Sequence, residues 1–483
     1  MESNREVEND PKGERKKLHA LAPIANTLTR KKLSKRNLKL VRHATKIWLS
    51  TSRGYPHKSA SAGSIPVPVF QLLFVTDGKY TEMESVTKGE TEMPKDTYRV
   101  AYIIHFLLGA GSLLPWNAVI TAVDYFGYCY PASLHVEKVF SVAYMASSLA
   151  TLVVMLMGFG TSHAGLAQRF RVRTNMGFSM FVLSLMLTPA MDWWLQEKKG
   201  PSAGKCATPY PAAVSAVVIC GLGDGLVGGA LFGSAGKLPK EYMQAIFAGT
   251  ASSGVFISIL RIITKASLPQ TPEGLKTSAH LYFIVSTAIL LLCIASSNLL
   301  YKLPVMNHHH HGLAPAGDKT PRFWEVARAV RWPAFGVFMI YTVTLSIFPG
   351  FLAENIRSDT LKDWYPILLI TLYNVSDFLG KSANGIYVVK SIGKATWGCV
   401  GRVLLYPFFS LCLHGPRWLK TETPIIFLTV ILGITNGYLT SVLMILSPKM
   451  VPVSESETAA IVMAVFLGLG LVSGSVLGWV WII

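Results

Sequence analysis

The chain has 483 residues, of which 51% are hydrophobic and only 15% are charged. Its apolar runs of about 18 to 25 residues match a hydrocarbon core about 30 Å thick, which excludes an ordinary soluble domain. The sequence therefore predicts an all-α, polytopic membrane protein.

The first 97 residues are predicted to form a basic, disordered tail without a span. Residues 1–60 hold 15 Lys/Arg against 5 Asp/Glu, which is +10 of the net charge of +18. Apolar residues at helical spacing within the basic stretch 30–46 allow a surface helix attracted to anionic lipid. A transit peptide is a second interpretation, disfavoured by acidic residues near the start, and a solvated extension is a third.

Eleven apolar stretches are long enough to cross a bilayer. They are Ala101–Phe126, Val139–Phe159, Asn175–Leu195, Pro209–Phe232, Ala245–Ile263, Leu281–Leu303, Pro333–Leu352, Trp364–Val388, Thr396–Leu413, Pro424–Leu446 and Thr458–Ile482. Arg261 and Arg402 weaken the fifth and ninth stretches, so a count of ten is an alternative.

A polar segment, residues 304–332, separates six predicted spans from five. This layout predicts a six-helix bundle over 98–303, a cytosolic linker over 304–332 and a five-helix bundle over 333–483, as in transporters built from two halves. The loops are nearly balanced in Lys/Arg, with 12 on one side and 10 on the other, and the basic tail then favours a cytosolic N-terminus. No signal distinguishes the plasma membrane from the vacuolar membrane.

The first span contains Pro115, which removes a backbone donor from a helix that lipid would require to be fully hydrogen-bonded. Such a residue is tolerated where protein or a watery cavity satisfies the freed groups. The helix around Pro115 is therefore expected to line a cavity.

Cysteine and histidine patterns predict neither a metal site nor a cofactor. His308–His311 lie in the linker, where imidazoles lack fixed geometry, so a solvated run is favoured over a metal site. Cys129 and Cys206 fall in loops on the same, non-cytosolic side, and either form a disulfide or remain thiols.

Four segments resemble the equilibrative nucleoside transporter family. They are GAGSLLPWN at 109–117, GALFGSAG at 229–236, YNVSDFLGK at 373–381, and NGYL at 436–439 with SPK at 447–449 and ETA at 457–459. The resemblance covers about 98–483 and implies eleven spans, a cytosolic N-terminus and a major-facilitator-like architecture. It also implies nucleosides such as adenosine and uridine as substrates, and proton coupling in the plant members that this chain resembles.

In the eighth span, Asn374, Asp377 and Lys381 stand at i, i+3 and i+7, which places them on one helix face. Charged residues at that depth face a cavity or a partner. In the family the corresponding residues lie at the substrate pathway, with arginine usually in the place of Lys381, so the resemblance assigns these three to substrate binding. A purely structural Asp377–Lys381 ion pair is the alternative.

A nucleoside requires apolar or aromatic walls for its base and a carboxylate that accepts both sugar hydroxyls. Leu113 and Trp116 are the predicted walls, and Asp377 is the predicted carboxylate. Gly228 stands where several family members carry a substrate-contacting glutamine, so contacts to the polar edge of the base must come from elsewhere.

Glycines recur every four residues in the fourth and eleventh predicted spans, which indicates close helix packing. They are Gly221, Gly225, Gly229 and Gly233, and Gly470, Gly474 and Gly478. Asp224 interrupts the first of these strips and has no cation within one helical turn. Burial of an unpaired carboxylate favours its neutral form, so Asp224 is the candidate proton carrier, and a buried structural aspartate is the alternative.

The sequence thus predicts a nucleoside transporter that works by alternating access, coupled to proton symport. A purely equilibrative carrier of nucleosides or organic cations is the first alternative, and a receptor or channel is the second. The chain carries no phosphate-binding glycine loop, nucleophile motif or metal-ligand cluster in a suitable context, so it is not expected to be an enzyme.

Overall fold

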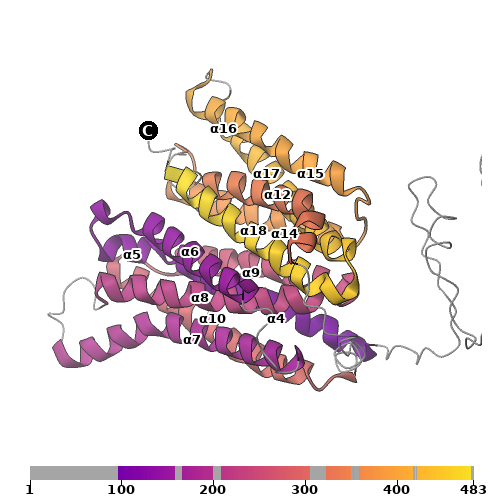
Figure 1. Cartoon of the computed structure of the whole chain (residues 1–483). Coiled ribbons are helices and arrows are strands. Elements are labelled where there is room, and N and C mark those ends of the chain that lie inside the picture. The colour runs from indigo at the N-terminus through magenta and orange to yellow at the C-terminus, as the bar shows by residue number, and fades with distance from the viewer. Residues whose placement is uncertain are drawn as a thin grey trace, which may run out of the picture. The chain divides into compact units, whose positions relative to one another are not determined.

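A computed structural model gives the fold of the chain (Figure 1). It describes residues 96–157, 166–199, 208–304, 323–349, 352, 358–416, 419 and 421–479. All of these belong to one compact unit, Thr91–Ile483, and they form helices and no strand. The all-α prediction is confirmed. Residues 1–95 of the predicted tail, the histidine run and Cys206 lie outside the described residues.

The described helices follow one another along the chain. The α-helices are α4 (Val100–Thr121), α5 (Val123–Cys129), α6 (Val136–Met157), α7 (Leu166–Lys199), α8 (Tyr210–Gly236), α9 (Lys240–Ser267), α10 (Pro272–Leu300), α12 (Phe323–Ile347), α14 (Tyr365–Ala383), α15 (Ile392–Gly401), α16 (Leu405–His414), α17 (Glu422–Leu446) and α18 (Ser456–Leu477). The 3₁₀ turns are η1 (Thr97–Arg99), η2 (Ala132–Leu134), η5 (Lys362–Trp364), η6 (Arg402–Leu404), η7 (Ser447–Met450) and η8 (Val453–Glu455).

Ten helices in the described part of the chain are long and apolar enough to cross a membrane, so the predicted count of eleven is not confirmed. The two stretches that contain Arg261 and Arg402 are among these ten. The predicted span without a counterpart is the eighth, which corresponds to α14, a helix of 19 residues. Asn374, Asp377 and Lys381 lower its mean hydropathy. Asp377 and Lys381 are buried in the protein, and Asn374 is half-buried.

The first predicted span is not interrupted at Pro115, because α4 continues through this residue to Thr121. The interruption comes at Ala122, after which α5 begins. Pro115 itself is buried, and Ser112, Leu113 and Trp116 around it line a cavity. The expectation that this helix lines a cavity is confirmed.

The ninth predicted span is divided into α15, the 3₁₀ turn η6 and α16. Pro407 explains the division, since it has no N–H to donate to the carbonyl of Val403 and its ring crowds that carbonyl. Arg402 begins the turn and is only 4% exposed.

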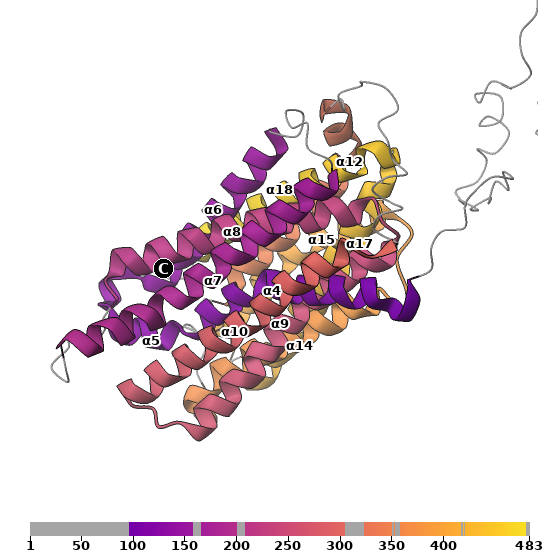
Figure 2. The ribbon, with the colours of Figure 1, turned by 90° about the horizontal axis from the view of Figure 1, so that it is seen from below.

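The helices pack in two groups (Figure 1). In the first group α4 packs against α9 and α10, and α8 packs against α6 and α7. In the second group α12 packs against α15, α17 and α18, and α14 packs against α17. The most extensive contacts between the groups are those of α9 with α14, α6 with α18, and α8 with α18. Helices α9 and α14 also run side by side in the view from below (Figure 2).

The predicted glycine strips lie at close helix contacts. A Cβ on Gly225 would stand 2.6 Å from the carbonyl oxygen of Ser148 on α6, and one on Gly474 would stand 2.7 Å from the carbonyl oxygen of Tyr341 on α12. Side chains at these two positions would separate the backbones. The prediction of close packing is confirmed there.

Polar residues near the C-terminal ends of α4 and α9 have partners within the protein. Arg261 on α9 forms an ion pair with Asp124 on α5 and donates to the carbonyl of Thr121 at 3.2 Å. Lys265 donates to the backbone carbonyl of Asp363 at 3.3 Å. Structural pairing therefore accounts for Arg261 in an apolar helix.

Cys129, at the end of α5, is disulfide-bonded.

Candidate functional site

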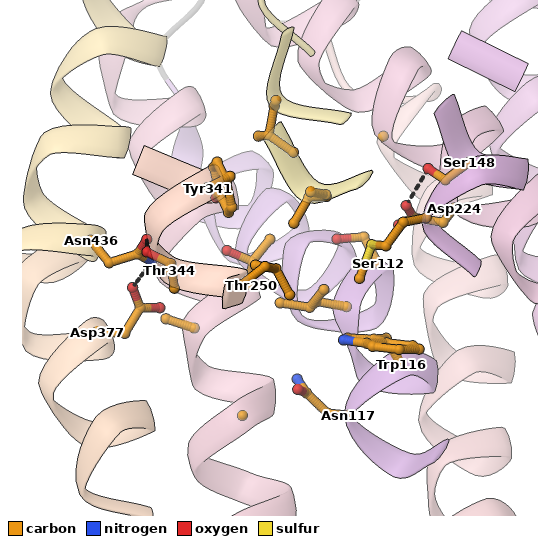
Figure 3. Close-up of a pocket in the computed structure, with 18 of the residues that line it drawn as sticks. Ser112, Trp116, Asn117, Ser148, Asp224, Thr250, Tyr341, Thr344, Asp377 and Asn436 are labelled. Atoms are coloured by element: carbon orange, nitrogen blue, oxygen red, sulfur yellow. Dashed lines mark hydrogen bonds between the residues drawn. The ribbon is translucent and has the colours of Figure 1, made fainter. Parts of the chain in front are cut away.

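A cavity of about 150 Å³ lies between the two helix groups (Figure 3). Its walls come from α4, α6, α8 and α9 on one side and from α12, α14, α17 and α18 on the other. All six residues predicted for substrate binding and proton coupling line it. They are Leu113, Trp116, Asp224, Asn374, Asp377 and Lys381.

Asp377 is the centre of a buried polar cluster on the second group. Its Oδ1 accepts a hydrogen bond from Nδ2 of Asn436 at 2.7 Å, and its Oδ2 pairs with Nζ of Lys381 at 2.8 Å. Both charged side chains are nearly inaccessible, at 6% and 4% exposure. Nζ of Lys381 also reaches Oγ1 of Thr250 on α9 at 3.4 Å. The predicted ion pair exists, and it lies on the cavity wall rather than between distant helices.

Asn374 lines the same cavity but directs its amide across to the other helix group. Its Nδ2 donates to Oγ of Ser258 at 2.8 Å and to the carbonyl of Gly254 at 3.3 Å, both on α9. Asn374 therefore links α14 to α9.

Asp224 lies on the opposite wall, on α8 (Figure 3). Its Oδ2 accepts a hydrogen bond from Oγ of Ser148 on α6 at 2.6 Å. Within the described part of the chain it has no ion-pair partner. Tyr144 lines the same wall, and its buried hydroxyl interacts with the Asp224 carboxylate. This wall thus holds a carboxylate without a cation.

Aromatic rings supply much of the apolar lining. Trp116 packs on Tyr144 with ring centroids 4.6 Å apart, and Leu113 lies one helical turn away on α4. Phe348 and Tyr373 stack at 3.9 Å on the other helix group. The cavity therefore has aromatic rings on both helix groups.

Several lining residues were not predicted as site residues, notably Tyr144, Ser148, Tyr341 and Asn436. Asn436 had a sequence signal, because it is an amide inside an apolar span and belongs to the NGYL segment. Nothing in the sequence links Ser148 to Asp224, since the two lie 76 positions apart and meet only through helix packing.

The described lining carries three charged side chains, namely Asp224, Asp377 and Lys381. Lys381 is already paired with Asp377. If both carboxylates are ionised, the net charge of the lining is −1, and no unpaired cation faces the cavity.

The fold is similar to that of solved transporters. The proton:xylose symporter XylE bound to 6-bromo-6-deoxy-D-glucose superposes with a TM-score of 0.54 at 11% identity, over 80% of this chain and 89% of that chain. A bacterial homologue of the iron transporter ferroportin superposes with a TM-score of 0.52 at 12% identity, over 79% and 91%. This similarity shows a major-facilitator-like fold, and the ten long apolar helices of the described residues show a multi-pass membrane protein.

Sequence comparison is more specific. The nucleoside transporter family matches residues 214–320 and 317–483. Equilibrative nucleotide transporter 8 of Arabidopsis thaliana is 60% identical over 400 residues, 83% of this chain and 99% of the relative, and equilibrative nucleotide transporter 1 of the same organism is 45% identical over 413 residues, 82% and 89%. The chain belongs to the equilibrative nucleoside transporter family, as its motifs indicate.

Proposed function

We propose that this protein moves nucleosides across a membrane by alternating access and couples the movement to proton symport. The observation that carries the proposal is one cavity between two helix groups, with a fixed carboxylate, Asp377, on one wall and a carboxylate without a cation, Asp224, on the other. The membrane is proposed to be the plasma membrane or the vacuolar membrane, with the N-terminus cytosolic.

Substrate binding is assigned to Leu113, Trp116, Asn374, Asp377 and Lys381. Each oxygen of Asp377 has one donor, Asn436 for Oδ1 and Lys381 for Oδ2, which leaves lone pairs for the two neighbouring hydroxyls of ribose. The ring face of Trp116 and the side chain of Leu113 form the wall for the base. Lysine in place of the usual family arginine keeps the charge that orients Asp377, without offering a two-pronged donor to the sugar.

The charge of the cavity favours a nucleoside over its phosphate ester. A phosphate group carries up to two negative charges and is normally held by unpaired Arg or Lys side chains. Here the one cation of the described lining, Lys381, is engaged with Asp377, so no free cation is left to hold a phosphate. A neutral nucleoside has no such conflict.

Alternating access is supported by polar contacts between the two helix groups on both sides of the cavity. At the end of α8, Lys237 pairs with Glu457 at the start of α18 at 2.6 Å. Near the end of α9, Lys265 reaches the carbonyl of Asp363, which precedes α14. In the proposed topology the first contact is cytosolic and the second is not, so opening one side requires breaking only one of them.

Proton coupling is assigned to Asp224. Removing a carboxylate charge from water is costly unless a cation offsets it, and no described cation does so here, whereas the protonated form is neutral. A change in the exposure of this wall between the two access states would then bind and release a proton.

Uptake of labelled uridine and adenosine tests the proposal in cells that lack nucleoside carriers and express the full chain. We expect saturable uptake that excess unlabelled uridine removes and that uridine monophosphate or a monoamine leaves unchanged. Competition by the monoamine would favour the second candidate, an organic-cation carrier. The observation that supports this candidate is the excess of carboxylates over cations on the described lining. Absence of saturable uptake would contradict a transporter and favour a receptor or channel.

A further inference from the structure

Arg402 is a fully enclosed cation that lies behind the cavity wall and does not line it. It is 4% exposed and comes from η6, the turn between α15 and α16. Its Nη2 donates to Oγ1 of Thr344 at 2.8 Å and to the carbonyl of Leu432 at 3.1 Å, and its Nη1 donates to Oδ1 of Asn436 at 3.4 Å. Its Nε has no partner among the described residues. Burying a charged guanidinium costs desolvation free energy, so a function is needed to explain the burial of Arg402.

The contacts of Arg402 fix which way the amide of Asn436 points. Oδ1 of Asn436 accepts from Nη1 of Arg402 and from the hydroxyl of Thr344, the latter at 2.9 Å. Since both neighbours supply donors, the amide oxygen must face them, and the amide NH₂ must face the other way. It therefore faces Asp377 and donates to Oδ1 at 2.7 Å (Figure 3).

A reversed amide would place its oxygen against the Asp377 carboxylate. An ionised carboxylate has no proton to donate, so no hydrogen bond could form between the two oxygens. The carboxylate would then lose one of its two donors and rotate away from its present plane. Arg402 prevents this arrangement without contacting the cavity.

Arg402 also adds a second positive charge behind this wall. The buried cluster holds one carboxylate, Asp377, with Lys381 in direct contact and Arg402 one amide further away. A carboxylate held between these donors can accept hydrogen bonds from two neighbouring hydroxyls at once.

We propose that Arg402 is a positioning residue for substrate recognition. It holds Asn436, and through Asn436 it holds the Asp377 carboxylate in the orientation that receives the 2′- and 3′-hydroxyls of ribose. The inference rests on the proposed function, in which Asp377 binds the sugar. It adds a specificity determinant outside the cavity, contributed by a helix that does not line it.

The test compares uptake of uridine with uptake of 2′,3′-dideoxyuridine, which lacks both hydroxyls. Each variant is measured as maximal rate over half-saturation constant, per molecule in the membrane. Wild type is expected to prefer uridine. Arg402→Gln is expected to lower the value for uridine about tenfold, the size of one hydrogen bond to a charged group, and to leave the value for the dideoxynucleoside nearly unchanged.

Arg261→Gln is the matched control, since Arg261 is also an arginine within a span but pairs with Asp124, away from Asp377. It is expected to keep the wild-type ratio of the two substrates. A role of Arg402 in stability alone would lower both substrates equally or only the amount inserted. Should Arg402→Gln fail to insert, Arg402→Lys serves instead, because it keeps the charge and loses the second donor arm.

The outcomes separate this inference from the proposed function. Wild type that prefers uridine, with Arg402 variants that keep the full preference, overturns the positioning role and leaves the proposed function intact. Wild type that transports both substrates equally overturns the ribose assignment of Asp377 and the positioning role with it. A preference lost in the Arg402 variants and kept in Arg261→Gln supports the inference.

Discussion

Among single side chains, Asp377 has both carboxylate oxygens engaged by buried donors, one from Asn436 and one from Lys381. Asp377→Asn removes the charge that these donors offset and leaves two buried cations, Lys381 and Arg402, without a carboxylate. We expect the variant to insert and its uptake per inserted molecule to fall at least about tenfold, as for the loss of one charge-assisted hydrogen bond. Labelled-uridine uptake and surface labelling measure the two quantities.

Asp359→Asn is the matched control, because Asp359 is exposed and lies before α14, outside the cavity. It is expected to behave as wild type. Normal uptake by correctly inserted Asp377→Asn would remove Asp377 from the substrate site.

Trp116 contributes ring surface rather than charge. Trp116→Ala removes a wall that packs on Tyr144 and is expected to raise the half-saturation concentration for uridine about three- to tenfold, the usual range for one aromatic contact. Concentration dependence of uptake checks this. Trp397→Ala, at a position that is 73% exposed, should leave the constant unchanged. An equal effect of both substitutions, or none, would make Trp116 a packing residue only.

Helix by helix, the sequence predicts the existence of the spans better than their ends. Apolar runs reveal only the lipid-facing length, whereas α7, α9 and α10 extend beyond it as Leu166–Lys199, Lys240–Ser267 and Pro272–Leu300. Helical spacing placed Asn374, Asp377 and Lys381 on one face, and all three line the cavity. The partners across the helices, such as Ser148 for Asp224, follow from tertiary packing, which periodicity within one helix does not encode.

The packing of α8 on α6 depends on a glycine that excludes a side chain. Gly225→Ala would place a Cβ 2.5 Å from Cβ of Thr151 and 2.6 Å from the carbonyl oxygen of Ser148. We expect a lower melting temperature of the detergent-solubilised protein, since overpacking costs about 1–3 kcal/mol. Thermal unfolding followed by size-exclusion fluorescence measures the change.

Gly228→Ala on the same helix is the control for folding. A Cβ there comes no closer than 3.6 Å to the ring of Phe232, which is ordinary contact. Because alanine stabilises a helix relative to glycine, this variant is expected to melt at or slightly above the wild-type temperature. Equal melting temperatures for both variants would show that α6 and α8 adjust without cost.

For the chain as a whole, the transport unit is expected to begin after the basic tail. Deletion of residues 1–82, with translation from Met83, should leave uptake per inserted molecule unchanged, because every predicted span and family motif follows Tyr98. Uptake and surface labelling of the truncated chain check this. A truncated protein that inserts but does not transport would give the tail a direct part in the cycle.

The driving force is a property of both helix groups together, since a proton must bind in one access state and leave in the other. If Asp224 carries the proton, uptake at an external pH of about 5.5 should exceed uptake at about 7.5, because more of the Asp224 side chain is protonated and neutral at the lower pH. A protonophore should abolish the excess. In Asp224→Asn the uptake should become indifferent to pH, and the cells should equilibrate substrate without concentrating it.

Ser148→Ala separates the carboxylate from its hydrogen bond. It removes the hydroxyl that donates to Asp224 at 2.6 Å but keeps the ionisable group, so the pH dependence of uptake should persist. Wild-type uptake that ignores both pH and protonophore would make the carrier equilibrative and Asp224 a buried structural residue. Uptake that stays pH-driven in Asp224→Asn would place the coupling carboxylate elsewhere, and Asp377, the other carboxylate on the described lining, would be the next position to test.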